Sequence, residues 1–283
     1  MLLFSALVAG SFSLGAMAAP FVDPIALTLA RFLIAGAVIA IAAVLTTGVA
    51  KGSFAAPWRY LILGGLYVLY FVLMFEGLKT APAVSASAVF TLTPVMAAGF
   101  GYVLLRQITT PWMAAALGIG AAGALWVIFR ADVAALMAFK IGKGELIYFW
   151  GCIAHALYIP MVRMLNRGEP AIVFSLGTLA GGTVLLALYG WRNMVETDWS
   201  ALPGIVWITL VYVAVAASAM TFVLVQYASM RLPAAKVMAY TYLTPSWVIL
   251  WEIALGNGAP VALTLAGIAC TVIALLMLLK GDG

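Results

Sequence analysis

Long apolar runs, interrupted only at proline, glycine and charged residues, limit what this chain can fold into. Ten such segments cover residues 2–19, 24–46, 57–79, 82–105, 111–130, 143–165, 170–192, 203–230, 233–255 and 260–280. A helix that crosses a bilayer needs about 20 predominantly apolar residues, and each segment has close to that length. The sequence therefore predicts an all-α integral membrane protein with ten transmembrane helices.

The charge content indicates that lipid is the solvent of most of this chain. Only 8% of the 283 residues are charged and 66% are hydrophobic, whereas soluble domains have about 25% charged residues. A soluble protein of this size cannot hide so much apolar surface. This composition excludes a soluble enzyme, a nucleic-acid-binding protein and a disordered protein, and it makes the lipid bilayer an expected partner.

Metal-ligating and redox residues are few and scattered. Cys152 and Cys270 lie far apart inside apolar runs, without the spacing of a disulfide framework or a metal site. The single histidine, His155, has no zinc ligands at the usual spacing. We therefore expect no metal ion, no cofactor and no catalytic residue.

The distribution of Lys and Arg predicts the orientation in the membrane. With the N-terminus inside, eight of the 14 basic residues lie at inner loops and helix ends and five at outer ones, with Arg31 left inside a segment. Cytoplasmic loops carry the excess of positive charge, so both termini are expected in the cytoplasm. Because no basic residue precedes Arg31, we interpret the first segment as a retained helix rather than a secretory signal peptide.

The two halves of the sequence resemble each other at an offset of 151 residues. Pro82 then aligns with Pro233, and the Leu-Thr-Pro triplet that ends at Pro94 aligns with the triplet that ends at Pro245. Each half contains five segments. Since five is odd, the second half enters the membrane from the opposite face.

This pattern predicts two five-helix repeats of inverted topology around a central cavity. The repeats cover residues 1–130 and 143–283, and a connecting loop covers residues 131–142. Inverted repeats are common among secondary transporters, whose substrate sites lie near the membrane midplane between the repeats.

Three prolines lie inside the fourth, sixth and ninth segments, namely Pro94, Pro160 and Pro245. Within a helix, proline removes a hydrogen bond and clashes with the preceding turn. The carbonyls of Phe90 and Thr241 thereby lose their donors, and in lipid they need other partners. Two interpretations remain open: kinks that only shape the bundle, or bends around a polar cavity that take part in gating.

Aromatic and polar side chains inside the segments are candidates for a substrate cavity. Packing alone explains most of them. If several face one cavity, however, their rings, hydroxyls and indoles suit an amphipathic metabolite with an apolar side chain. The candidates are Tyr67, Tyr70, Ser85, Phe90, Trp150, His155, Tyr158, Tyr240, Tyr242 and Trp247.

Two charged residues inside segments are candidates for a charge role, because charges in the membrane are costly and mark functional positions. Arg31 either pairs with a substrate carboxylate or holds a backbone carbonyl. Glu76 lies three residues before Lys79, a spacing at which side chains meet on a helix surface. An ion pair is favoured there over a proton carrier.

Several short motifs along the chain are shared with one family of membrane proteins. They are Gly10-Ser11-Phe12, Arg31, the two Leu-Thr-Pro triplets and Ala154-His155-Ala156-Leu157-Tyr158 followed by Arg163. On these motifs the whole chain resembles the EamA-type drug/metabolite transporter superfamily. It is most similar to the YddG-type exporters of aromatic and other amino acids, which are bacterial inner-membrane proteins.

These features predict a secondary transporter rather than an enzyme. We expect it to export amino acids with aromatic or other apolar side chains, such as tryptophan, phenylalanine, methionine and threonine, or related small metabolites, by alternating access. The alternatives are an intramembrane enzyme, which needs a Ser–His pair, a metal cluster or a carboxylate-rich motif, and a metabolite or lipid channel of the same architecture. A monomer or weak homo-oligomer is expected, and proton-coupled and facilitated transport both remain open.

Overall fold

The computed structural model describes residues 1–129, 131–137, 141–258 and 262–280, and within these ranges the chain is helical without strands. Eight helices in this part of the chain are long and apolar enough to cross a membrane. They are Pro24–Thr46, Trp58–Leu78, Ala83–Leu105, Pro111–Ile128, Lys143–Leu165, Ala171–Glu196, Gly204–Ser229 and Ala262–Lys280. The prediction of an all-α membrane protein is confirmed.

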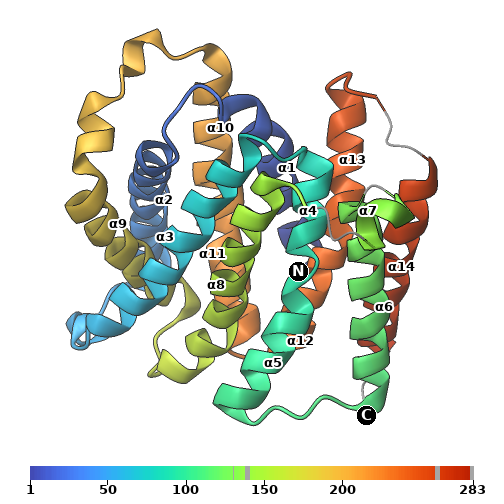
Figure 1. Cartoon of the computed structure of the whole chain (residues 1–283). Coiled ribbons are helices and arrows are strands. Elements are labelled where there is room, and N and C mark those ends of the chain that lie inside the picture. Colours follow the sequence, from blue (N-terminus) through green and yellow to red (C-terminus); the bar gives the residue numbers. More distant parts are fainter. Residues whose placement is uncertain (130, 138–140, 259–261, 281–283) are drawn as a thin grey trace.

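The first half of the chain contains six helices (Figure 1). They are α1 (Leu2–Ala18), α2 (Pro24–Thr46), α3 (Trp58–Leu78), α4 (Ala83–Phe90), α5 (Thr93–Leu105) and α6 (Pro111–Ile128), with the 3-10 turn η1 (Lys51–Phe54) before α3. Asp23 and Thr110 cap the N-termini of α2 and α6 through their side-chain oxygens, and each is followed by a proline in the first turn. Both arrangements are favourable at a helix start.

The second half repeats this helical pattern with more interruptions. It contains α7 (Val133–Met137), α8 (Lys143–Leu165), α9 (Ala171–Glu196), the 3-10 turn η2 (Trp199–Ala201), α10 (Gly204–Ala214), the π-helix η3 (Val215–Met220), α11 (Thr221–Ser229), α12 (Ala234–Ala239), the 3-10 turn η4 (Tyr240–Leu243), α13 (Thr244–Ala254) and α14 (Ala262–Lys280). α10, η3 and α11 follow one another without a break and form one apolar span of 26 residues.

Two of the ten predicted segments differ from the eight long helices. Segment 2–19 forms α1, which has 17 residues, and segment 233–255 is divided among α12, η4 and α13. Both lie among apolar helices. α1 has the length of the shortest spanning helices, and the second segment is not a single helix. The count of ten spans and their inverted topology therefore stay predictions.

Pro94 and Pro245 begin helices rather than bend them. Pro94 is the second residue of α5, which a two-residue turn separates from α4, and Pro245 is the second residue of α13. Their missing N–H groups fall in the first turn of a helix, where no intrahelical partner is needed. Each proline thus follows an interruption within its predicted segment, between α4 and α5 for Pro94 and between η4 and α13 for Pro245. That these interruptions take part in gating stays a prediction. Pro160, in contrast, lies inside the continuous helix α8.

The two helix breaks meet each other in the bundle. The hydroxyl of Thr93 donates to the carbonyl of Phe90 at 2.7 Å, and its oxygen lies 3.3 Å from the hydroxyl oxygen of Thr241. The carbonyl of Thr241 accepts the backbone N–H of Thr244. Both carbonyls that the prolines deprive of donors thus have partners inside the protein, as lipid surroundings require.

Helices of the two halves pack between one another rather than forming separate bundles. α3 packs against α8 and α9, α2 against α9, α6 against α14, and α1 against α10 and α13; Figure 1 shows α6 beside α14. Where Gly64 meets Gly182, and where Gly123 meets Gly267, backbone atoms occupy the space that a Cβ would need. Such small residues let membrane helices approach closely.

Candidate functional site

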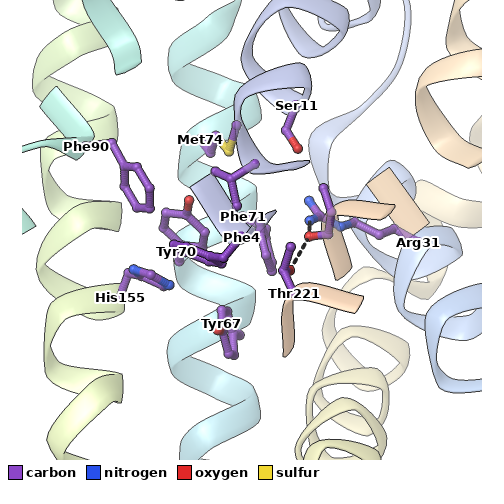
Figure 2. A pocket seen from close by; sticks show the side chains of 12 residues that line it. Phe4, Ser11, Arg31, Tyr67, Tyr70, Phe71, Met74, Phe90, His155 and Thr221 are labelled. Carbon is purple, nitrogen blue, oxygen red and sulfur yellow. Dashed lines mark hydrogen bonds between the residues drawn. The ribbon is translucent and has the colours of Figure 1, made fainter. Parts of the chain in front are cut away.

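A small cavity lies where helices of both halves meet (Figure 2). Its volume is about 10 Å³, which is room for about one water molecule. A metabolite therefore fits only after the helices separate. The lining residues are Phe4, Val8, Ser11, Arg31, Tyr67, Tyr70, Phe71, Met74, Phe90, His155, Ala217 and Thr221.

Aromatic rings belong to half of the residues that line the cavity. Tyr70 of α3 stacks on His155 of α8, with ring centroids 4.4 Å apart. Tyr67, one turn earlier on α3, lies 4.0 Å from the ring of Tyr158 and 4.1 Å from the ring of Phe222. Because residues three or four apart share one helix face, α3 presents its aromatic residues to α8 and α11 together.

Arg31 supplies the positive charge at this cavity. Its side chain is 0% exposed. Its Nε donates to the hydroxyl of Ser218, Nη2 donates to the carbonyl of Ala217 at 2.8 Å, and the guanidinium carbon lies 3.6 Å from the ring centroid of Phe71. Nη1 has no hydrogen-bond partner, and no acidic side chain in the described part of the chain pairs with Arg31.

The π-helix η3 provides the acceptors for Arg31. The carbonyl of Ala217 accepts from Arg31 and also from the hydroxyl of Thr221 at 2.9 Å, while Ser218 donates its hydroxyl to the carbonyl of Val213 at 2.7 Å. A π-helical turn widens the backbone and is frequent at functional sites. The wide turn therefore orients the arginine from the side of the second half.

A buried polar network continues from the aromatic wall toward α9 and α11. Gln226 donates from Nε2 to the hydroxyl of Tyr158 at 2.7 Å and to that of Thr178 at 3.2 Å. Tyr148 donates its hydroxyl to that of Tyr70 at 3.2 Å. These contacts hold the tyrosine rings in place behind the cavity.

The structure places the sequence candidates in three different surroundings. Arg31, Tyr67, Tyr70, Phe90 and His155 line the cavity, with Tyr158 directly behind Tyr67. That these residues bind substrate stays a prediction.

Two other candidates, one buried and one half-buried, form hydrogen bonds without lining the cavity. Ser85 donates to the buried carboxylate of Glu145 at 2.7 Å, and Trp247 donates from Nε1 to the hydroxyl of Ser5 at 3.2 Å. Neither Ser85 nor Trp247 is among the residues that line the cavity.

Three candidates lie away from the cavity, so their expected position there is wrong. Trp150 is 59% exposed on the outer surface of α8, because five residues rotate it about 140° from His155. Tyr242 fills the space beside Gly120 and belongs to a separate apolar cluster of α6, α12 and α14, against which Tyr240 also packs.

Glu76 forms the ion pair that its spacing predicts, with Lys79 Nζ 2.7 Å from the carboxylate oxygen. Both side chains are partly exposed, at 44% and 35%. The pair lies at the end of α3 and does not line the cavity.

Sequence reasoning missed several cavity residues and one buried ion pair. Phe71 follows Tyr67 by four residues on the same helix face, and this spacing was available as a signal. Thr221 follows the π-helix, which has no sequence signature. Arg59 and Glu169 are 110 residues apart, and nothing in the sequence pairs them.

The buried pair of Arg59 and Glu169 joins α3 to the loop between α8 and α9. Arg59 is 1% exposed and donates to the carboxylate of Glu169 and to the carbonyl of Leu165, both at 2.7 Å. Burial by itself would raise the pKa of Glu169. Hydrogen bonds from Arg59 and from the backbone N–H of Arg167 outweigh burial and lower that pKa below its ordinary value.

No group of three His, Cys, Asp or Glu in the described ranges is placed to hold a metal ion. The groups that the cavity offers are aromatic rings, hydroxyls, one imidazole and one guanidinium. This arrangement suits non-covalent binding of an amphipathic molecule.

Comparisons with known proteins agree with a membrane carrier. The protein named "Uncharacterized transporter YyaM" of Bacillus subtilis (strain 168) is 23% identical over 256 residues, covering 90% of this chain and 84% of that protein. A protein of known crystal structure, 23% identical, matches with a TM-score of 0.75 over 98% of this chain and 94% of its own, a likeness of fold alone.

The family comparison covers nearly the whole chain. The model of the EamA-like transporter family matches residues 1–129 and 142–280. The resemblance that the sequence motifs indicated is thereby confirmed at the level of the family, while the YddG-type subgroup stays a prediction. With its apolar spanning helices and these two matched regions, the chain belongs to the EamA-like transporter family.

Proposed function

We propose that this protein is a secondary transporter that exports amino acids with aromatic or other apolar side chains, or related small metabolites, across the bacterial inner membrane. The observation that carries the proposal is the composition of the cavity wall. The lining residues come from both halves of the chain. The first half provides residues of α1, α2, α3 and α4, and the second half provides residues of α8, η3 and α11. A site between two halves becomes accessible to either side when the halves rock against each other.

The packing of the helices supports two inverted five-helix repeats, over residues 1–130 and 143–283. α3 rests on α8 and α9, and the span of α10, η3 and α11 rests on α1 and α2. The two contacts correspond to each other in the proposed repeats, because α3 is equivalent to the span of α10, η3 and α11, while α8 and α9 are equivalent to α1 and α2. The equivalent triplet breaks also meet, at Thr93 and Thr241. On this proposal α1 and the α12–α13 segment complete ten spans, and both termini lie in the cytoplasm.

The chemistry of the wall supports the class of cargo. Tyr67, Tyr70, Phe71 and Phe90 offer large apolar ring surfaces, which bind an apolar side chain well. Arg31 adds a single charge to this wall. The small volume of the closed cavity, about 10 Å³, favours a carrier that opens and closes over a channel with a continuous path.

The proposal is tested by flux in proteoliposomes. The purified protein is reconstituted, and efflux of labelled tryptophan, phenylalanine, methionine and threonine is followed with and without an imposed pH gradient. We expect saturable efflux in which these amino acids compete with one another. Flux that responds to the pH gradient would indicate proton coupling, and flux without such a response would indicate facilitated transport. Absence of flux for all four would contradict the proposed cargo.

A pair of variants tests the location of the site. Tyr67→Ala removes a ring of the cavity wall, and loss of about 1.4 kcal/mol of aromatic contact corresponds to about tenfold weaker apparent affinity. Trp150→Ala is the matched control, because this ring lies on the outer surface of α8. We expect Trp150→Ala to transport within about twofold of the wild type. Equal effects of the two variants would place the site elsewhere.

A further inference from the structure

No acidic side chain in the described ranges compensates the charge of Arg31. Its guanidinium is fully buried, and its two hydrogen-bonded nitrogens, Nε and Nη2, donate to a hydroxyl and a carbonyl, both of which are neutral. A charge inside a membrane protein is costly unless it is paired, and it marks a functional position. An anion from outside the described chain would supply the missing negative charge.

The guanidinium is already fixed in one orientation. Ser218 and Ala217 hold one edge, and Phe71 covers one face at 3.6 Å. Nη1 is left as a buried donor without a partner on a side chain that lines the cavity. Figure 2 shows Arg31 reaching the cavity from one side, with Phe90 and His155 on the opposite side. A planar guanidinium with a free N–H edge matches a carboxylate.

The cavity offers no acidic partner for an ammonium group. Among its described lining residues there is no Asp or Glu. The ammonium group of an amino acid would meet ring faces, the imidazole of His155 and the hydroxyls of serine, threonine and tyrosine side chains, none of which is a carboxylate. Such contacts are weaker than a buried ion pair.

We infer that the transported molecule is recognised as an organic carboxylate with an apolar tail, whose carboxylate accepts from Nη1 of Arg31 while its tail lies against Tyr67, Tyr70 and Phe90. The amino group is dispensable for this recognition. This inference rests on the proposed transport function and narrows its cargo to a chemical class. The set of expected cargo molecules then includes the α-hydroxy and α-keto acids that correspond to these amino acids.

The inference is tested first by competition for binding to the intact protein in nanodiscs. Labelled L-phenylalanine is displaced by L-phenylalanine, by 3-phenyllactate, which lacks the ammonium group, and by phenylalaninamide, which lacks the carboxylate. We expect phenyllactate to compete within about threefold of phenylalanine. Phenylalaninamide is expected to bind roughly five- to tenfold more weakly, since a hydrogen bond to a charged group is stronger than one to a neutral group by about that factor. Phenyl phosphate is included to separate a carboxylate site from a general anion site.

Variants separate recognition by Arg31 from a purely structural role. Arg31→Gln is expected to bind phenylalanine and its amide with similar affinity, and Arg31→Lys to keep a reduced preference for the carboxylate. Ser218→Ala removes one contact that positions the guanidinium but keeps its charge, so the preference for the carboxylate is retained. A structural role alone would weaken all three compounds equally and leave their order unchanged.

The outcomes distinguish this inference from the proposed function. Three results would overturn carboxylate recognition even if flux is observed. The wild type would bind phenylalanine and its amide equally, it would bind phenyl phosphate more tightly than phenylalanine, or phenyllactate would fail to compete. Binding in the expected order without flux in proteoliposomes would contradict transport and leave the recognition intact. If neither phenylalanine nor phenyllactate binds, carboxylate recognition is overturned, and transport is then judged by the flux of the four amino acids.

Discussion

Among the residues that the structure describes, Arg31 and Arg59 are fully buried. Their surroundings differ in whether the guanidinium has an acidic partner. Arg59 is 1% exposed and contacts the carboxylate of Glu169 at 2.7 Å. Arg31 is 0% exposed and contacts only neutral acceptors and a ring, with one nitrogen left without a partner. Arg59 ties α3 to the loop after α8, whereas Arg31 lies at the cavity between the halves.

This difference separates a structural charge from a functional one. A buried charge that is paired with a counter-ion inside the protein does not attract a charged ligand. Removing one partner leaves the other charge buried and unpaired, which destabilises the fold. A buried charge without a counter-ion has already lost its water, and it gains most when an anion arrives. The comparison predicts opposite consequences for stability and for binding at the two positions.

The largest effect on stability is expected for Glu169→Gln. This change leaves the Arg59 guanidinium buried without its counter-ion, which costs about 3 kcal/mol of unfolding free energy. The double replacement Arg59→Met with Glu169→Leu removes both charges and should restore most of the loss. Unfolding curves in detergent micelles measure both variants. If Glu169→Gln is as stable as the wild type, the pair is not a structural charge.

Acid should reproduce part of that loss. The pKa of Glu169 is lower in the folded protein than its ordinary value of 4.5, so its ionised form stabilises the fold above that pH. The contribution declines as the pH falls through the folded pKa, because the unfolded state then binds the proton more readily. The stability difference between wild type and Glu169→Gln should therefore shrink as the pH falls below the ordinary pKa of 4.5 and toward the lower pKa of the folded protein. A difference that stays constant would exclude titration of Glu169.

A smaller change in stability is expected for Arg31→Met. It removes two hydrogen bonds and a ring contact, but it also removes a buried charge without a counter-ion. These effects oppose each other, so we expect less than about 1.5 kcal/mol, together with loss of the preference for carboxylates. The same unfolding measurement, paired with the competition assay, checks this. Destabilisation as large as that of Glu169→Gln would make Arg31 a structural clamp.

The smallest effect on stability is expected for the partly exposed ion pair of Glu76 and Lys79. Both side chains are partly exposed, and water screens such a pair. Glu76→Gln should change the unfolding free energy by less than about 0.5 kcal/mol, and added salt should not enlarge the change. A loss comparable to that of Glu169→Gln would show that exposure does not distinguish these ion pairs.

The sequence was most informative where helix signals are local. The predicted segment 24–46 matches Pro24–Thr46, because Asp23 and Pro24 mark its start by capping and by proline chemistry. The signal at Pro94 was less complete. A proline inside an apolar run suggested a bend, and the structure has a two-residue turn there, between the end of α4 at Phe90 and the start of α5 at Thr93.

The candidate site was predictable only in part, for a reason that applies to membrane proteins in general. Tyr67, Tyr70 and His155 line the cavity, whereas Trp150 faces outward and Tyr242 packs in another cluster. All five lie inside apolar segments. Lipid is as apolar as a protein core, so hydropathy does not show which face of a helix points inward.

By itself the sequence determined the solvent, the helical class, most of the spans and the internal resemblance of the two halves. These follow from composition and short-range spacing, which act within one helix. The tertiary structure alone decided that Arg59 meets Glu169 and that Arg31 meets η3, since those contacts join positions 110 and about 187 residues apart. The few charges of this chain, 8% of its residues, differ in role because their partners are set by packing.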